Sequence, residues 1–492
     1  MPFHYRPADG FVGDVIPFFW KHTYHLFYLK APLPPMREGA AATPWAHIIS
    51  DNLLDWKDLP IALAPGGEGE PDAGGCWTGS VIERDKVFHI FYTGHAPGDP
   101  QRPQTVCHAT SPDLVTWEKD PGNPVLVPDP SRYERTDWRD PFVFWNDAEA
   151  CYWMLITARL KDVPTPRAGC IALAKSADLD DWEVQGPLWA PYLVHAPECP
   201  DLFELGRAEP GKPELGKRWY LVFSTNETRY RVGLSPAGPW GAPALESFDG
   251  PRLYAAKTLS DGTRRLLFGW VPTRQGESDG GAWDWGGDLA LPRQLAPDAD
   301  GALITHCPDE ITEAFGPTLV HPDEIGGFQA RLGRWIASDA ALTGESRDGF
   351  AYALCPLPMS DFAARVEVTM DAQPTRAGLL LRAGDNLERG YVLMLEPLMQ
   401  RMTFRPWRSW GDGEPFVERP LRIVRGEPLT LQFVLEGSIF EVMAEGRCCL
   451  TCRMYDHRDG RLGLFVENGL AEFSGLTMWS LNARGDGPSQ RK

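Results

Sequence analysis

Hydrophobic residues along this chain fall in short runs, many of them aromatic, separated by turns rich in Gly, Pro, Asp and Asn. Apolar residues at intervals of three and four, which would predict amphipathic helices, are nearly absent. Short β-branched and aromatic runs bounded by turn residues are typical of strands. The pattern therefore predicts an all-β protein.

A segment that ends in tryptophan recurs along the first part of the chain. Residues 50–56 (SDNLLDW) return as 111–117 (SPDLVTW) and as 176–182 (SADLDDW). Each copy follows a strand with a polar head and then a second, aromatic strand. Two later units, which begin at Glu198 and Arg252, keep the strand pair without the tryptophan segment. The predicted pairs are 13–19 with 24–28, 78–82 with 88–92, 139–144 with 152–156, 198–203 with 219–223, and 252–256 with 265–270.

Five units of about four strands each predict a five-bladed β-propeller. A solenoid would be another arrangement of such units. Radial closure is favoured because it hides the edge strands of unequal units with polar heads.

The repeat stops after about residue 320, and residues 317–322 are predicted to form a linker. Strands with alternating apolar and polar positions are predicted at 363–369, 378–382 and 429–434. Such strands favour a two-sheet β-sandwich. The expected organisation is a propeller over 1–320 and a β-sandwich over 321–482, and the tail 483–492 is predicted to be disordered.

Three carboxylates stand at or near the heads of first strands: Asp14, Asp140 and Glu198. The first strand of each propeller blade lines the central channel, so the topology should bring these distant residues to one mouth. Cleavage of a glycosidic bond needs a proton donor for the leaving oxygen and a base or nucleophile at the anomeric carbon, and two carboxyl groups supply both. A cation held by the three carboxylates is a rival interpretation, although no Asp-rich calcium loop is visible.

The neighbours of each carboxylate suggest its role. Glu198 has few charges nearby in the sequence, and partial burial would keep it protonated as the general acid. Asp14 is the expected nucleophile, with the small Gly13 leaving room for a sugar. Asp140 follows Arg139, which should keep it ionised to hold ring hydroxyls and stabilise an oxocarbenium-like transition state.

Composition narrows the partners and the compartment. The formal net charge of −19 repels phosphate backbones, so a nucleic acid is not expected. No apolar run is long enough for a bilayer, and the N-terminus lacks a secretion signal, which together predict a cytoplasmic protein. The 10 cysteines are interpreted as reduced thiols, and the cluster Cys448, Cys449 and Cys452 as strand packing without a metal. No cofactor is expected.

A series of motifs, in this order, resembles glycoside hydrolase family thirty-two, the invertases, inulinases and levanases, over nearly the whole chain. The motifs are 45–50 (WAHIIS), 59–65 (LPIALAP), 75–80 (GCWTGS), 139–141 (RDP), 198–200 (ECP), 285–295 (WGGDLALPRQL) and 460–466 (GRLGLFV). The resemblance implies a retaining mechanism in which Asp14 attacks, Glu198 acts as acid and then base, and Asp140 holds hydroxyls. The residues expected to bind substrate are Trp77, Thr78, Arg139, Cys199, Leu29 and Trp285, the last as an aromatic wall. The sandwich would support the propeller and assist a homodimer.

The sequence departs from the family around the nucleophile. Members usually carry Asn-Asp-Pro-Asn-Gly there, whereas this chain has Asp14 between Gly13 and Val15, and Leu29 stands where a glutamine is common. We expect hydrolysis of a non-reducing furanoside, with a β-fructofuranoside in a small oligosaccharide favoured, and poor activity as a general invertase. Replacement of the lost contacts by Arg139 or by a residue of the loop 32–43 stays open. The functions of an arabinofuranosidase-like hydrolase, a fructosyltransferase and a sugar-binding protein without activity stay open as well.

Overall fold

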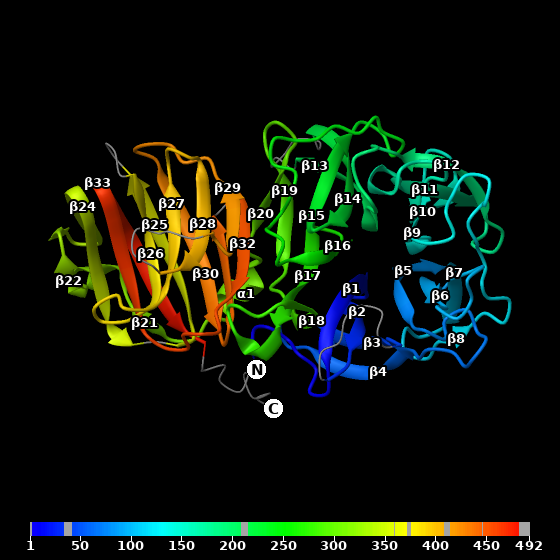
Figure 1. Cartoon of the computed structure of the whole chain (residues 1–492), viewed down its shortest axis with the longest axis horizontal. Helices are drawn as coiled ribbons and strands as arrows, with labels where there is room; N and C mark the ends of the chain where they lie inside the picture. The colour runs from blue at the N-terminus through cyan, green and yellow to red at the C-terminus, as the bar shows by residue number, and fades with distance from the viewer. Residues whose placement is uncertain are drawn as a thin grey trace, which may run out of the picture.

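The computed structural model describes residues 2–33, 42–207, 215–358, 360–370, 375–407, 414–444 and 446–481. It is almost entirely β-structure, with a propeller and a sandwich packed side by side (Figure 1). The tail 483–492 and most of the loop 32–43 lie outside the described residues, so the expectations for them remain predictions. No helix among the described residues is long and apolar enough to cross a bilayer.

The first three blades are antiparallel four-stranded units that match the predicted strand pairs. Blade one consists of β1 (Phe11–Trp20), β2 (Thr23–Ala31), β3 (Trp45–Ser50) and β4 (Lys57–Leu63). Blade two consists of β5 (Cys76–Arg84), β6 (Val87–His95), β7 (Gln104–Ser111) and β8 (Glu118–Lys119). Blade three consists of β9 (Arg139–Asn146), β10 (Cys151–Arg159), β11 (Gly169–Ser176) and β12 (Glu183–Trp189), with η1 (Thr165–Arg167) between β10 and β11.

The last two blades are less regular than the first three. In its described residues, blade four has β13 (Glu198–Arg207), β14 (Leu215–Thr225) and β15 (Glu227–Gly233), and isolated bridges to Gly241 and Ser247 supply its outer edge. Blade five has β16 (Tyr254–Ser260), β17 (Arg265–Arg274), β18 (Trp283–Leu289), β19 (Arg293–Pro297) and β20 (Leu303–His306), with η2 (Gln275–Glu277) after β17. Strand β18 pairs with both β17 and β1, which joins the last blade to the first and closes the ring.

The repeated tryptophan segment is a turn at the end of the third strand of blades one to three. In the second copy, Asp113 Oδ1 accepts the backbone N–H groups of Val115 and Thr116 at 2.9 and 2.7 Å. The indole of Trp117 then donates to the Leu114 carbonyl at 3.1 Å. Asp and Ser side chains stabilise such turns by bonding to nearby backbone groups. The repeat therefore marks one position in each of the three blades.

The C-terminal part is a sandwich built around one long strand, β33 (Arg461–Ser480), which pairs with β21, β24, β25 and β26. The other strands are β21 (Thr318–Val320), β22 (Gln329–Leu332), β23 (Arg334–Ala337), β24 (Ala341–Pro358), β25 (Phe362–Met370), β26 (Arg376–Ala383), β27 (Tyr391–Glu396), β28 (Arg401–Pro406), β29 (Val417–Pro420), β30 (Pro428–Glu436), β31 (Ile439–Ala444) and β32 (Cys448–Arg453). Two short helices, α1 (Asp309–Glu313) and η3 (Pro322–Gly327), flank β21. One large apolar core fills the space between the layers.

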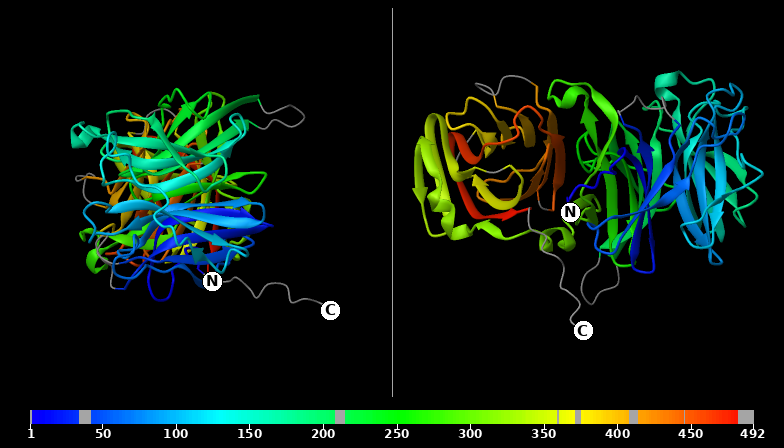
Figure 2. Two further views of the ribbon diagram at one scale, coloured as in Figure 1. Left: turned by 90° about the vertical axis from the view of Figure 1, so that its right-hand side faces the viewer. Right: turned by 90° about the horizontal axis from the view of Figure 1, so that it is seen from below.

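The expected linker is partly a strand. Within residues 317–322, Thr318–Val320 forms β21 and pairs with β33, so this segment already belongs to the C-terminal sheet. The alternation there is too short to predict pairing with a strand at the far end of the chain. The domain boundary near residue 320 remains a prediction. Figure 2 shows the two layered bodies side by side from below.

Candidate active site

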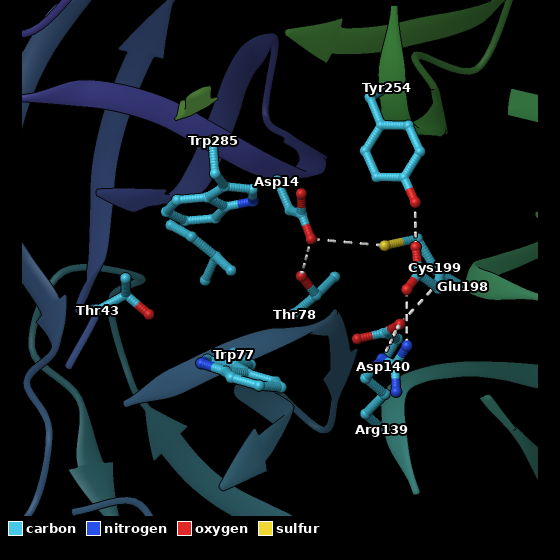
Figure 3. A pocket seen from close by; sticks show the side chains of 11 residues that line it. Asp14, Thr43, Trp77, Thr78, Arg139, Asp140, Glu198, Cys199, Tyr254 and Trp285 are labelled. Atoms are coloured by element: carbon cyan, nitrogen blue, oxygen red, sulfur yellow. Dashed lines mark hydrogen bonds and ion pairs between the residues drawn. The ribbon is translucent and has the colours of Figure 1, made fainter. Parts of the chain in front are cut away.

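A small pocket lies where strands of several blades meet (Figure 3). The residues that line it are Asp14, Leu29, Thr43, Trp77, Thr78, Arg139, Asp140, Glu198, Cys199, Tyr254 and Trp285. All nine site residues expected from the sequence are among them, and Thr43 and Tyr254 are additional. The blades thus bring residues from widely separated parts of the chain into one cavity.

Asp14 lies at an irregularity of β1. The pairing of β1 with β2 shifts register between Val12 and Val15, as at a β-bulge, which re-aims a side chain. Gly13 is needed here because an added Cβ would lie 2.6 Å from the ring of Trp285. The expectation that Gly13 leaves room for a sugar was therefore wrong: the room is occupied by the indole of Trp285.

Three donors surround the carboxylate of Asp14. Thr78 Oγ1 donates to Oδ2 at 2.7 Å, the indole of Trp270 donates to Oδ1 at 3.2 Å, and the thiol of Cys199 lies 3.6 Å from Oδ2. Burial raises the pKa of Asp14 to about 6, the bond from Thr78 opposes the rise, and the negative charges of Asp140 and Glu198 add to it. Asp14 is thus a carboxylate whose protonation changes close to neutral pH.

Glu198, the first residue of β13, has a charged partner that its sequence neighbours did not indicate. Arg139 Nη2 lies 2.6 Å from Glu198 Oε1, and the hydroxyl of Tyr254 donates to Oε2. The same guanidinium is paired with Asp137, which Arg159 also contacts at 2.7 Å. Glu198 has few charged neighbours in the sequence, but the adjacent blade places Arg139 of β9 beside it. Arg139 and Tyr254 therefore fix the orientation of the Glu198 carboxyl group.

Asp140 is 3% exposed and is held by four groups. The backbone N–H of Cys199 donates to its Oδ2 at 2.9 Å, Thr157 Oγ1 donates to the same oxygen at 3.3 Å, and Arg139 Nε lies 3.6 Å away. Its own backbone N–H donates to Thr93 Oγ1 at 2.7 Å. Burial raises the pKa of Asp140, while Arg139, the N–H of Cys199 and the ammonium of Lys257 oppose that rise. Arg139 favours the ionised form as expected, but burial outweighs it.

Aromatic rings form two sides of the pocket. Trp285 packs edge to face against Trp270, with ring centroids 6.0 Å apart at 72°. Trp77 lies stacked on His95 at 3.9 Å, which fixes its ring, and in Figure 3 it faces Trp285 across the pocket. Leu29, 3% exposed, adds an apolar surface between β2 and the pocket. Such walls suit the apolar faces of a sugar ring.

Tyr254 and Lys257 are among the residues near the carboxylates that the sequence prediction missed, for different reasons. Tyr254 is the first residue of β16, the same position in its blade that Glu198 has in β13, so applying the channel rule to aromatic heads would have found it. Lys257, three positions later, is 2% exposed and donates to the Gly79 carbonyl at 2.7 Å. No local signal marks Lys257, because its relevance depends on which blades meet.

The arrangement of possible ligand side chains bears on metal binding. Within the described ranges, no group of three or more His, Cys, Asp or Glu side chains has an arrangement that would hold a metal ion. Cys448, Cys449 and Cys452 are buried in β32, where they pack as strand residues.

Comparison with known proteins identifies the family of this chain. Residues 4–307 match the family described as Glycosyl hydrolases family 32 N-terminal domain. The chain is 26% identical over 518 residues to a sucrose-6-phosphate hydrolase of Escherichia coli, covering 97% of this chain and 94% of that protein. It is also 26% identical over 547 residues to a cell wall isozyme of β-fructofuranosidase from Zea mays, covering 97% and 89%.

A solved structure agrees with this assignment at the level of the fold. The crystal structure of fructan 1-exohydrolase IIa from Cichorium intybus has a TM-score of 0.72 at 21% identity, covering 97% of this chain and 96% of that one. Its match extends over both the propeller and the sandwich. With the family match covering most of the propeller and the motifs around Asp140 and Glu198 in place, this chain belongs to glycoside hydrolase family 32 and is a glycoside hydrolase.

Proposed function

We propose that the protein is a retaining β-fructofuranosidase that removes the non-reducing terminal fructosyl unit from a small oligosaccharide. One observation carries the proposal: Asp14, Asp140 and Glu198, from three different blades, line one pocket whose walls are Trp77 and Trp285. A sugar-binding protein needs the aromatic walls but gains nothing from a buried nucleophile beside a second carboxyl group. The printed names of the relatives, a sucrose-6-phosphate hydrolase and a β-fructofuranosidase, favour fructose as the sugar.

In the first step, one Asp14 oxygen attacks the anomeric carbon while Glu198 gives its proton to the leaving oxygen. The bond from carbon to that oxygen breaks, a bond from carbon to Asp14 forms, and the released alcohol carries the proton. Asp14 must be ionised for this step. The donors Thr78 and Trp270 orient its carboxylate, and Thr78 opposes the effect of burial on its pKa.

In the second step, Glu198 accepts a proton from water as the water oxygen attacks the same carbon and Asp14 leaves. The two inversions give net retention, and both carboxyl groups return to their starting states. Arg139 and Tyr254 hold Glu198 in place through both steps. Asp140, held by the N–H of Cys199 and by Thr157, would bind ring hydroxyls and stabilise positive charge on the ring.

Leu29 bears on the choice of substrate. Leu29 presents a hydrocarbon surface where many family members have glutamine, so one polar contact to the terminal sugar is missing. A net hydrogen bond contributes about 0.5–1.5 kcal/mol, and an unpaired buried polar group costs about 1–3 kcal/mol. We therefore expect kcat/KM on sucrose to lie below about 10⁴ M⁻¹s⁻¹, the lower end of the usual enzyme range.

We also propose that the protein acts in the cytoplasm and forms a homodimer through the sandwich. All 10 cysteines lie in the described residues and are free thiols, which suits a reducing compartment. Light scattering of the purified protein would test the dimer, and fractionation of the source cells would test the location.

The deciding experiment measures release of fructose from sucrose, 1-kestose and inulin beside aryl β-D-fructofuranosides and α-L-arabinofuranosides. Early-time NMR of the released sugar should show retention, because attack by Asp14 and then by water inverts the anomeric carbon twice. Sites of this kind hold the two carboxyl groups about 5–5.5 Å apart. Inverted product, or turnover of arabinosides without fructosides, would contradict the proposal. Oligosaccharide products longer than the substrate would instead identify fructosyl transfer.

A further inference from the structure

One buried polar group in the pocket has no hydrogen-bond partner. Thr43 is 4% exposed and lines the cavity, yet no described residue bonds its hydroxyl oxygen. Its position is fixed by the main chain, because the N–H of Cys76 donates to the Thr43 carbonyl at 2.9 Å. A rigidly placed hydroxyl without a partner is costly to bury, so such a group in a pocket points to a ligand.

A second polar atom faces the same space. An added Cβ on Gly75 would lie 2.9 Å from the backbone nitrogen of Thr43, 3.1 Å from Thr43 Oγ1 and 3.3 Å from Trp77 Nε1, so both polar atoms lie close together beside Gly75. No described residue accepts a hydrogen bond from Trp77 Nε1. Stacking on His95 and a bond from Trp45 to the Trp77 carbonyl at 2.9 Å hold this indole in place. Gly75 has φ +135°, a conformation that residues with a side chain rarely adopt, so Thr43 and Trp77 approach each other here with no side chain between them.

The chemistry of this space suits a hydroxyl group. Thr43 Oγ1 can donate or accept, and Trp77 Nε1 can only donate, so together they satisfy an oxygen that carries one proton. A phosphate there would lack a cation, since the only basic residue that lines the pocket within the described chain is Arg139, which is engaged with Glu198.

The space lies away from the reacting bond. In Figure 3, Thr43 stands on the opposite side of the pocket from Glu198, with Asp14 and Thr78 between them. A sugar whose anomeric carbon lies between Asp14 and Glu198, and whose ring lies between Trp77 and Trp285, therefore points its far end at Thr43. In a fructofuranosyl unit, the exocyclic 6-hydroxyl is the hydroxyl group that reaches farthest in that direction.

We infer that Thr43 Oγ1 and Trp77 Nε1, which both line the pocket beside Gly75, form a notch that binds the 6-hydroxyl of the terminal fructosyl unit. This inference rests on the proposed function and extends it. The notch replaces part of the polar contact that Leu29 cannot provide, and it selects terminal units whose 6-hydroxyl is free. A unit that carries a phosphate or a further sugar on that oxygen does not fit it.

The test combines a substrate change with a residue change. Initial rates are measured on sucrose and on sucrose that lacks the 6-hydroxyl of its fructosyl unit, with the wild type, Thr43→Val and Thr43→Ser. The wild type should lose about 10- to 100-fold in kcat/KM on the deoxy substrate, because a site built for a hydroxyl rejects its absence. In Thr43→Val, kcat/KM on sucrose should be about tenfold below the wild-type value, and kcat/KM on the deoxy substrate should be less than about threefold lower again. Thr43→Ser should keep the wild-type ratio of kcat/KM for the two substrates.

Thr105→Val is the matched control, because it removes another buried hydroxyl, from β7, outside the active-site pocket. This variant should have the wild-type ratio of kcat/KM for the two substrates. If Thr43→Val discriminates between the substrates as strongly as the wild type does, other residues bind the 6-hydroxyl and the inference fails. Turnover of sucrose would still support the proposed function in that case. If the wild type cleaves no fructoside, the proposed function and the inference fail together.

Discussion

At the scale of single residues, the groups around Asp14 have opposing effects on the pKa of its carboxyl group. Burial and two neighbouring carboxyl groups favour its protonated form, whereas Thr78 and Trp270 donate hydrogen bonds that favour the ionised form. The pKa near 6 is the balance of these effects. A nucleophile poised in this way is reactive once ionised, because its surroundings solvate the charge incompletely.

The raised pKa of Asp14 predicts the acid side of the pH profile. Only the ionised carboxylate attacks, so kcat/KM should fall about tenfold for each pH unit below about pH 6. Thr78→Val removes a donor that lowers the pKa, so the acid limb should move to higher pH. Steady-state rates between pH 4 and 8, with stability checked at each pH, would measure this. An acid limb below pH 5, or one that does not move in Thr78→Val, contradicts the role of Asp14.

Removing either reacting carboxyl group should abolish turnover without unfolding the protein. We expect Asp14→Asn and Glu198→Gln to lower kcat by about three to five orders of magnitude, as losses of a nucleophile or a proton donor do. Glu204→Gln is the control for Glu198→Gln, because Glu204 lies on the same strand, is exposed and pairs with Lys217. Wild-type rates in either active-site variant, with thermal unfolding unchanged, would remove that residue from the mechanism.

At the scale of elements, the bulge in β1 connects two blades. Its register shift carries Asp14 toward the pocket, and Gly13 lets Trp285 of β18 pack directly on the bulge. Since β18 also pairs with β1 at Val12 and Gly287, the ring closure and the aromatic wall depend on the same contact. Local strand geometry and pocket shape are therefore coupled at this point.

Gly13→Ala should damage the site more than the fold. The added methyl would lie 2.6–2.7 Å from the Trp285 ring, so the indole must move. We expect kcat/KM to fall at least about tenfold, as small displacements of positioning groups do, with a destabilisation of about 1–3 kcal/mol from overpacking. Gly186→Ala in β12 is the control, because nothing lies within 4 Å of its added Cβ. Unchanged kinetics in Gly13→Ala would show that Trp285 contributes little to substrate binding.

At the scale of the whole molecule, a buried ionic network joins the propeller to the sandwich. Near the N-terminus, His4 contacts Glu436 at 2.8 Å and Glu441 at 3.0 Å. Arg293 of β19 reaches Glu441 at 2.5 Å and Asp249 at 3.0 Å. These contacts surround an apolar cluster that includes Phe3, Leu291 and Val434, from both domains. The two bodies are therefore expected to unfold together.

The network predicts a loss of stability at alkaline pH. The two glutamates raise the pKa of His4 to about 9 despite its burial, against 6.5 in the unfolded chain. A raised histidine pKa contributes stability that is complete below about pH 6.5 and is lost as the pH rises through 9. The loss should be about 3 kcal/mol. Denaturant unfolding of the wild type and His4→Gln at pH 6 and pH 10 would measure it. A difference between the two proteins that does not shrink at pH 10 would contradict the charged state of His4.

Sequence patterns alone were enough to predict the repeat, the strand pairs and the three carboxylates, and the family resemblance added the other six expected pocket residues. These properties are local: alternating hydrophobicity specifies strands, the recurring turn marks blades, and a carboxylate at the head of a first strand faces the channel whatever its partners. The motifs around Asp140 and Glu198 added the family. Each of these signals is contained within a few neighbouring positions.

Which groups touch one another depends on the tertiary structure. Arg139 and Glu198 are 59 positions apart, and their pairing follows from the angle between blades rather than from either motif. Trp285 occupies the space beside Gly13 because the last blade closes on the first, and Thr43 and Gly75 meet because β3 and β5 belong to adjacent blades. Contacts between residues far apart in the chain depend on how the ring closes, and no local pattern of side chains encodes that distance.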